Sequence, residues 1–324
     1  MMDGVSFTEP TRGGKPQINF AEPTRGGKPQ INFAEPTRGG KPQINFMKGH
    51  GTGNDFVILP DPDGALALTP ELVAWLCDRH FGIGGDGVLR VVCSAKHPDA
   101  AGYAGEAEWF MDYWNSDGSP AEMCGNGVRV FTRYLTANGL ATPGPAGLPV
   151  ATRAGVVVAV VEGRTIRVHM TTPRVYAAST ATLGALTIPG IAVDCGNPHL
   201  VCGLHDGLEL PALDLAAPPG FDRALFAAGV NVEFVTPAAP VDGADLHVAM
   251  RVYERGSGET LSCGTGGLAV GAVALREAGL TTGTVAVDVR GGRLTVTHDD
   301  RDRWWLAGPA VLVASGEVDP AVLS

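Results

Sequence analysis

Apolar residues recur along the chain with two different periods, and each period predicts one kind of element. Two segments, 128–135 and 268–275, carry apolar side chains at the spacing of an amphipathic helix. A further helix is expected over about 70–80 after a Thr69 cap, and a short one over 222–228. Short apolar or alternating runs predict strands at 44–48, 57–59, 88–92, 109–114, 156–161, 165–170, 191–194, 231–234, 247–253, 284–289, 293–297, 304–306 and 310–313.

The two long helical segments begin in the same way. A cysteine followed by Gly-x-Gly precedes each of them: Cys124 in Met-Cys-Gly-Asn-Gly and Cys263 in Ser-Cys-Gly-Thr-Gly. A glycine, Gly139 or Gly279, stands where each helix would end. The repeated device predicts an α+β fold of two pseudo-symmetric domains, each a mostly antiparallel, barrel-like sheet around one central helix.

A cysteine at a helix N-terminus lies among unpaired backbone N–H groups and the positive end of the helix dipole. This field lowers the pKa of the thiol from about 8.5 toward the thiolate. The same N–H groups bind anions such as a carboxylate. For either copy alone, ordinary small residues at ordinary helix caps are the simpler interpretation, but two copies with similar flanks favour a pair of activatable thiols around one cleft.

Two glycine-rich segments have different interpretations. Residues 49–56 form a loop that lets backbone approach a ligand, with Asn54 as a candidate polar contact, although a mere turn is the alternative. Residues 82–87 match Gly-x-Gly-x-x-Gly, but they follow a helix and lead into a strand. A dinucleotide fingerprint has the opposite order, so we reject a nucleotide site there.

Composition and charge narrow the functional class. The chain has 324 residues, of which 44% are hydrophobic, and a net charge of −10, which argues against nucleic acid as a partner. Neither a signal segment nor a membrane span is evident, so a cytoplasmic protein is expected. Six scattered cysteines predict reduced thiols rather than a disulfide scaffold, and the histidine spacing indicates no metal site.

Residues 1–43 form a repeated extension. Three copies of Glu-Pro-Thr-Arg-Gly-Gly-Lys-Pro-Gln-Ile-Asn-Phe begin at Glu9, Glu22 and Glu35, and only the third runs directly into the first expected strand. We expect the two earlier copies to be disordered or loosely attached, as a duplicated gene start or an artefact.

The chain resembles the diaminopimelate epimerase family from about residue 44 to residue 324. The motifs that carry the resemblance are HGTGNDF, FGIGGDGV, NSDGS, MCGNG, GNPH, YERGSGET and SCGTG, which begin at residues 50, 81, 115, 123, 196, 253 and 262. The resemblance implies cofactor-independent interconversion of LL- and meso-diaminopimelate, a homodimer, and a role in lysine and peptidoglycan precursor synthesis. It also implies an N-terminal domain of residues 44–172 plus 310–324 and a C-terminal domain of residues 173–309.

The family mechanism, carried over by motif, assigns a role to each site residue. Cys124 and Cys263 are the two acid/base residues on opposite faces of the α-carbon, and His199 and Glu254 are their polar partners. The reacting carboxylate would be held by backbone N–H groups of Gly125, Asn126, Gly264 and Thr265. The distal, non-reacting centre would be held by Asn115, Asn197, Asn231 and Arg255, with Asn54 lining the same pocket.

Several alternatives and departures stay open at this point. Asn115 and Asn231 are also typical of residues that cap turns. Gly87 occupies the place of a glutamine that some family members use at the substrate, so it receives no side-chain role, and CGTG replaces the common CGSG. The rival functions are a proline-type or other racemase of the same fold, and a non-catalytic amino-acid-binding protein in which Cys124 and Cys263 form a disulfide.

Overall fold

The computed structural model describes residues 37–38, 41–205 and 207–319. The chain divides into two compact units, residues 1–31 and 32–324, and all the described residues belong to the second. The expectation for the first two repeat copies therefore lies outside the described residues. In the third copy, β1 (Thr37–Arg38) pairs with β2 (Lys41–Pro42), and Ile44 begins the first long strand as predicted.

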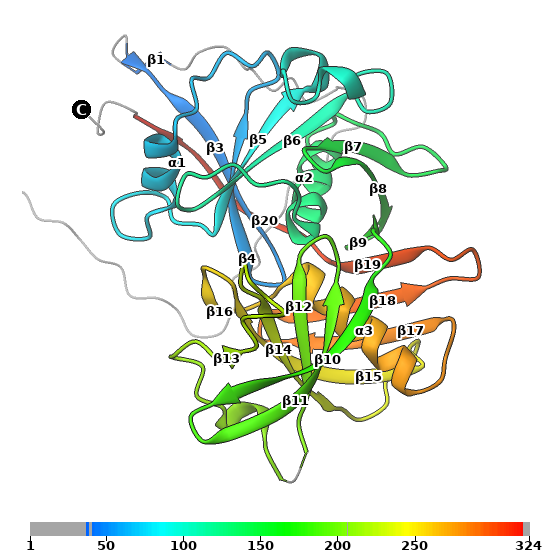
Figure 1. Cartoon of the computed structure of the whole chain (residues 1–324). Helices are drawn as coiled ribbons and strands as arrows, with labels where there is room; N and C mark the ends of the chain where they lie inside the picture. Colours follow the sequence, from blue (N-terminus) through cyan, green and yellow to red (C-terminus); the bar gives the residue numbers. More distant parts are fainter. Residues whose placement is uncertain (1–36, 39–40, 206, 320–324) are drawn as a thin grey trace, which may run out of the picture. The chain divides into compact units, whose positions relative to one another are not determined.

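The described residues form three α-helices and one sheet of eighteen strands (Figure 1). The helices are α1 (Pro70–Cys77), α2 (Gly125–Ala137) and α3 (Gly264–Glu277). The strands are β3 (Ile44–Gly51), β4 (Asn54–Pro60), β5 (Gly87–Cys93), β6 (Trp109–Asn115), β7 (Leu148–Thr152), β8 (Gly155–Glu162), β9 (Thr165–Met170), β10 (Arg174–Leu183), β11 (Leu186–Asp194), β12 (Pro198–Gly203), β13 (Gly220–Phe221), β14 (Asn231–Pro237), β15 (Leu246–Glu254), β16 (Gly258–Thr260), β17 (Gly283–Val289), β18 (Gly292–His298), β19 (Trp304–Pro309) and β20 (Val311–Val318). Short 3-10 turns lie at Ser94–Lys96, Ala101–Tyr103 and Leu210–Ala212.

Strand pairing confirms the internal repeat. From β3 to β9 the successive pairs are antiparallel, parallel, antiparallel, parallel, antiparallel and antiparallel. The series β11, β12, β14, β15, β17, β18 and β19 follows the same order. β4 is therefore equivalent to β12, β5 to β14 and β6 to β15, and each series holds one of the two long helices between equivalent strands.

The two long helices are the centre of the hydrophobic core. On α2 the predicted apolar positions Val128, Val130, Phe131 and Leu135 are fully buried, and on α3 the equivalent apolar face is buried too. Strands of both series pack around them in one cluster of buried side chains. β9 also pairs with β19, so the two halves share a continuous sheet.

The prediction of a helix over residues 222–228 is wrong. The segment is a turn in which the Asp222 carboxylate accepts hydrogen bonds from the Ala224 and Leu225 N–H groups, and the Phe226 N–H donates to the Asp222 carbonyl. It is enclosed by β13 and β14, and Gly229, with φ of +86°, stops it. So short a segment has no room to propagate beyond the costly first turn of a helix.

Several further elements differ from the expectation, and the strands β7, β12, β13 and β16 were not predicted. α1 ends at Cys77 rather than near residue 80, because Asp78 is extended and its carboxylate accepts the N–H groups of His80 and Phe81 instead. β10 was not predicted, because its alternating residues are largely alanine, serine and threonine and give little apolar contrast.

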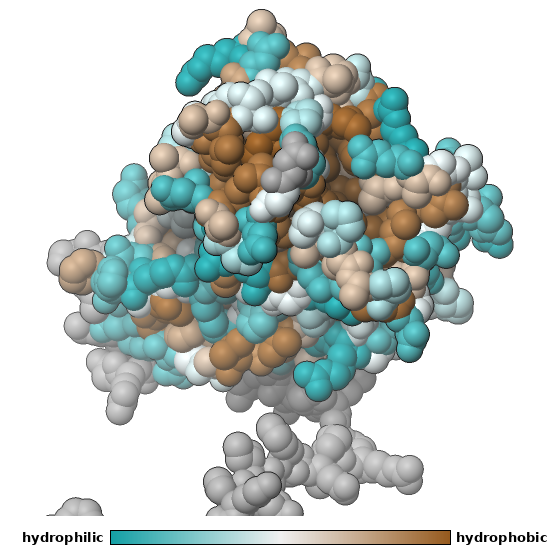
Figure 2. Space-filling view, turned by 90° about the horizontal axis from the view of Figure 1, so that it is seen from below, coloured by the Kyte–Doolittle hydropathy of each residue, from teal (hydrophilic) through white to brown (hydrophobic). Residues whose placement is uncertain are grey.

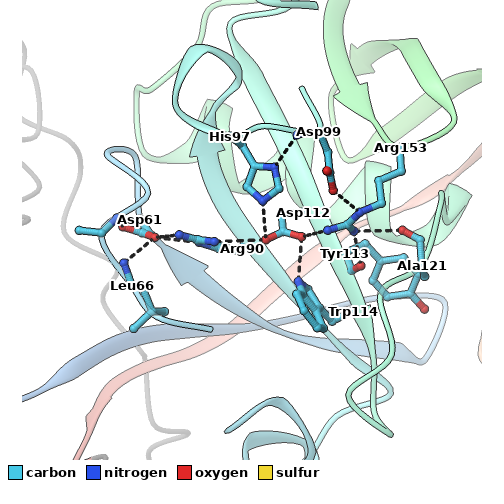
Figure 3. A network of polar contacts seen from close by, with 11 residues as sticks. Asp61, Leu66, Arg90, His97, Asp99, Asp112, Tyr113, Trp114, Ala121 and Arg153 are labelled. Atoms are coloured by element: carbon cyan, nitrogen blue, oxygen red, sulfur yellow. Dashed lines mark hydrogen bonds and ion pairs between the residues drawn. The ribbon is translucent and has the colours of Figure 1, made fainter. Parts of the chain in front are cut away.

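A buried ion-pair network fastens the segment that precedes α2 (Figure 3). The Asp112 carboxylate lies between the guanidinium groups of Arg90 and Arg153, at 3.5 and 2.5 Å, and accepts the Trp114 indole N–H at 2.7 Å. Arg153 also donates to the carbonyl oxygens of Tyr113 and Ala121. The network thus ties β6 to the chain that runs toward Cys124.

The surface is not uniformly polar. Figure 2 shows apolar side chains gathered in the middle of one face and polar side chains around them. Within the described ranges, no helix has the length and apolar character needed to cross a membrane.

Candidate active site

The two predicted cysteines cap the two central helices. Cys124 is the N-cap of α2 and Cys263 is the N-cap of α3, both with extended backbone. Each sulfur accepts a hydrogen bond at 3.4 Å from an N–H group three residues later, in Gly127 or Gly266. Both cysteines are free thiols, so the disulfide expected of a binding protein does not form in this structure.

The starts of the two helices meet at one side chain. A β-carbon on Gly125 would lie 3.0 Å from Leu306 Cδ2, and one on Gly264 would lie 3.2 Å from the same atom. The amide of Asn126 donates to the Ser262 carbonyl oxygen at 3.3 Å, across the same junction. The structure therefore brings together the first turns of α2 and α3, whose free N–H groups are the predicted carboxylate site.

Asn54 lies beside the first thiol. Its Oδ1 accepts the Asn126 amide at 3.1 Å and is 3.7 Å from Cys124 Sγ, which donates to it. Its Nδ2 donates to Asp86 Oδ2 at 2.8 Å, which holds the amide in one orientation. The predicted polar contact of the glycine-rich loop thus turns its carbonyl oxygen toward Cys124 and Asn126.

His199 and Glu254 lie on strands of the second series, which surrounds α3. The Thr260 hydroxyl donates to the Glu254 carboxylate at 2.5 Å, and burial raises the pKa of Glu254. The Nδ1 atom of His199 is 2.7 Å from Glu233 Oε1, and its Nε2 atom is 3.0 Å from Asn197 Oδ1. Glu233 was not predicted as a site residue.

The expectation that helix ends lower the thiol pKa values is wrong. Burial raises the pKa of Cys124 to about 11, although the Gly127 N–H pulls it down. Burial, followed by the negative charges of Glu254 and Glu233, raises the pKa of Cys263 well above its usual value. The helix-end field acts in the expected direction, but desolvation of the charged form outweighs it.

Asn231 and Arg255 connect neighbouring segments of the second half, and Asn115 makes contacts within its own turn. Asn231 donates to the Pro198 carbonyl and accepts the Arg255 backbone N–H. The Arg255 guanidinium is exposed and donates to the Ala228 carbonyl. Asn115 joins Tyr113 Oη and Ser119 Oγ, as a turn residue does. Each of the two asparagines still has a second amide N–H for a ligand.

Gly87 has a structural reason to lack a side chain. A β-carbon there would lie 2.4 Å from the Trp114 carbonyl oxygen across β5 and β6. The glutamine of some relatives therefore has no direct counterpart in this chain. Among the described residues, no three histidine, cysteine, aspartate or glutamate side chains are grouped to hold a metal ion.

Sequence reasoning missed the residues that orient the predicted ones. Asp86 bonds to Asn54, Glu233 bonds to His199, and the Ser262 carbonyl accepts a hydrogen bond from Asn126. None of the three orienting residues stands at a spacing that indicates a role. Asp86 and Ser262 do stand inside the quoted motifs FGIGGDGV and SCGTG, and Glu233 is a single carboxylate within the short extended run 231–234.

Comparisons with known proteins agree over nearly the whole domain. The family model described as "Diaminopimelate epimerase" matches residues 46–176 and 191–318. The diaminopimelate epimerase of Streptomyces coelicolor is 51% identical over 86% of this chain and 96% of its own. That of Mycolicibacterium smegmatis is 49% identical over 84% of this chain and 96% of its own.

Solved structures share the fold at lower identity. A Bacillus anthracis phenazine biosynthesis protein of the PhzF family superposes with a TM-score of 0.59 at 18% identity, covering 85% of this chain and 99% of that chain. A hydroxyproline epimerase from Agrobacterium vitis superposes with a TM-score of 0.57 at 16% identity, covering 86% of this chain and 94% of that chain.

Proposed function

The chain belongs to the diaminopimelate epimerase family, and from this premise we propose that Cys124 and Cys263 are the acid and base that invert one α-carbon of its substrate. The activity is that of an isomerase, and it places the chain in lysine and peptidoglycan precursor synthesis. The observation that carries the thiol assignment is the equivalence of two cysteine-capped helices whose first turns meet at Leu306.

The reaction moves one proton through the site. One cysteine, as thiolate, takes the α-proton from one face, and the other, as thiol, delivers its own proton to the carbanion from the opposite face. The product is the inverted centre, and the two sulfurs have exchanged their protonation states. N–H groups of Gly125, Asn126, Gly264 and Thr265 would hold the α-carboxylate and stabilise the charge that develops beside it.

The raised thiol pKa values give substrate binding a part in activation. Both sulfurs are neutral near pH 7, because burial disfavours the thiolate. The substrate's α-ammonium group brings a positive charge that favours a thiolate. Glu254, whose carboxylate contacts Cys263, and His199 would assist thiolate formation and bind that ammonium group. Asn115, Asn197, Asn231 and Arg255 would hold the distal centre, with Asn54 beside the reacting one.

The division into domains of residues 44–172 plus 310–324 and 173–309 is supported by the repeated strand order. We further propose a cytoplasmic homodimer, which the apolar area of Figure 2 supports as a possible subunit contact. Light scattering that gave the mass of one chain at micromolar concentration would contradict the dimer.

Isotope exchange tests the proposed thiol pair. The reduced protein is incubated in deuterium oxide with LL-diaminopimelate and no added cofactor, and α-deuterium uptake is followed together with the meso isomer. We expect Cys124→Ala and Cys263→Ala each to lower the rate of inversion by at least about 100-fold, because each removes an acid/base group. Cys77→Ala, which removes a buried cysteine of α1, is the matched control and should keep the rate.

Two outcomes would contradict the proposal. Inversion at the normal rate in either active-site variant would remove that cysteine from the chemistry. If diaminopimelate is untouched while L-proline or another amino acid is inverted, the proline-type alternative holds and the distal-site assignment fails.

A further inference from the structure

A buried pair of side chains is apolar in the first half of the repeat and polar in the second. Strand register aligns Phe56 with Gly87 in the first half and His199 with Asn231 in the second. Counting along these equivalent strands, Phe56 corresponds to His199 and Leu89 to Glu233. All four side chains belong to residues with no exposed surface, so a histidine and a glutamate replace two apolar core residues.

The fold does not need a carboxylate at this place. In the first half, a β-carbon on Gly127 would lie 3.4 Å from Leu89. In the second, a β-carbon on Gly266 would lie 2.7 Å from Glu233 Oε1. The two side chains thus fill equivalent positions beside the first turn of a cysteine-capped helix. Because leucine suffices in one half, the buried charge in the other calls for a different explanation.

The contacts of His199 fix where its protons lie. Nε2 must carry a proton in order to donate to Asn197 Oδ1 at 3.0 Å. A second proton must lie between Nδ1 and Glu233 Oε1, because two lone pairs 2.7 Å apart would repel each other. Whether this proton is written on the imidazole or on the carboxyl group, Nε2 keeps its own.

The equivalent asparagines are consequently held in opposite orientations. Asp86 accepts from the Asn54 amide group, so Asn54 presents its Oδ1 to Cys124 and Asn126. His199 donates to Asn197 Oδ1 instead, which leaves the Asn197 Nδ2 group without a partner among the described residues. One half thus offers a hydrogen-bond acceptor where the other offers a donor.

We propose that Glu233 is a positioning residue of the active site, which acts through His199 to keep the Asn197 amide turned with its N–H₂ group toward the substrate. The donor suits a substrate carboxylate, so this inference rests on the proposed distal site. Around the pair lie Glu254 on β15, Cys263 on α3 and Cys195 after β11. Burial raises the pKa of each of these three groups, and the negative charge of Glu233 adds to each shift. The second carboxylate oxygen of Glu233 is buried without a hydrogen bond, so its contact with His199 is the one that offsets its burial.

Nuclear magnetic resonance of ¹⁵N-histidine-labelled enzyme tests the proton placement without turnover. With the signal assigned by a His199→Asn variant, we expect Nε2 of His199 to carry a proton at neutral pH in the substrate-free enzyme. An unprotonated Nε2 would overturn the proposal. Because the measurement needs no catalysis, its outcome is independent of the thiol assignment.

Kinetics of two substitutions test the effect on substrate binding. Glu233→Leu installs the residue that the first half uses and frees the His199 tautomer, so we expect KM for diaminopimelate to rise about tenfold, with a smaller change in kcat. In Glu233→Gln the amide can donate to Nδ1 and preserve Nε2–H, so KM should stay within about threefold of the original value. Phe234→Leu, a buried change on the next residue of β14, is the control for altered packing.

Each result bears on the proposal. An unchanged KM in Glu233→Leu, or an equal rise in Glu233→Gln and Glu233→Leu, would overturn it. If Glu233→Leu does not fold, as judged by circular dichroism, Glu233→Gln decides together with the ¹⁵N signal: retention of Nε2–H with a near-normal KM supports the proposal, and loss of either overturns it.

Discussion

At the scale of single residues, two opposing effects act on each thiol. The N-cap position gives Cys124 and Cys263 an N–H donor and the positive end of a helix dipole, which favour the thiolate. Burial favours the neutral thiol, and near Cys263 the carboxylates of Glu254 and Glu233 add to it. Burial prevails, so both thiols keep their protons at neutral pH.

This balance predicts how the thiols react with pH. We expect carbamidomethylation of Cys124 by iodoacetamide, measured by peptide mass spectrometry without substrate, to rise with pH and reach half its maximum near pH 11. The unfolded protein is the control, because its thiols titrate near their ordinary value of about 8.5. Half-maximal reaction at or below pH 8 would mean that the helix end outweighs burial.

The raised pKa of Cys124 also makes the free energy of unfolding depend on pH. A thiol whose pKa is higher in the folded state than in the unfolded state binds its proton more tightly when folded. For Cys124 this contribution to the free energy of unfolding is fully present below the unfolded pKa and is lost as the pH rises through about 11. Alkaline conditions therefore weaken the fold and activate the thiol together.

Site residues were predictable where their signal was local. Cys124 and Cys263 stand in a repeated motif at a helix start, so spacing alone revealed their place. Their raised pKa values were not predictable, because burial depends on side chains far away in the sequence. Glu233 was missed for the same reason, since its meaning comes from the contact with His199 across a parallel strand pair.

At the scale of elements, the spacing of apolar residues predicted the central helices and most strands, whereas the structure of the segments that connect them was harder to predict. Both central helices and most strands overlap the expected residues, because burial on one face imposes a regular spacing, whereas β7, β10, β12, β13 and β16 were not expected. The segment 222–228 has helical composition but forms a turn, as β13 and Gly229 leave it no room. The sequence did not reveal strand order, which depends on which edges meet in space.

The turn before β14 also positions a predicted substrate residue, and Gly229→Ala tests this. Gly229 has φ of +86°, and a β-carbon there would lie 2.9 Å from Arg255 Cδ. Alanine would displace the arginine, so we expect KM for diaminopimelate to rise about tenfold or more, as the loss of one charge-assisted hydrogen bond implies. Steady-state kinetics with LL-diaminopimelate measure it.

Gly243→Ala is the matched control for this substitution. Gly243 has a similar φ of +81°, but a β-carbon there would meet nothing within 4 Å. Both variants therefore carry a backbone cost of about 1–2 kcal/mol, and only Gly229→Ala disturbs Arg255. Equal KM values in the two variants would remove Arg255 from the substrate site.

At the scale of the whole described unit, β19 connects the halves. It pairs with β18 of the second series and β9 of the first, and its Leu306 side chain packs against the starts of both cysteine-capped helices. Proton transfer from opposite faces of one carbon requires the two thiols to keep a fixed separation. A shared strand and a shared side chain are a physical means of keeping it.

Leu306→Ala therefore has a different expected effect from the same substitution of an equally buried leucine beside α3. Leu294 on β18 is also fully buried and lies 3.0 Å from the β-carbon position of Gly267 on α3. Each substitution should lower the free energy of unfolding by about 2–5 kcal/mol, because each leaves a cavity in the core. Leu306→Ala alone loosens both helix starts, so its kcat should fall by a further 10- to 100-fold or so through misplaced thiols. Urea unfolding and kcat, measured at a temperature where both variants are folded, separate these effects; equal loss of kcat in both would mean that Leu306 contributes stability and not alignment.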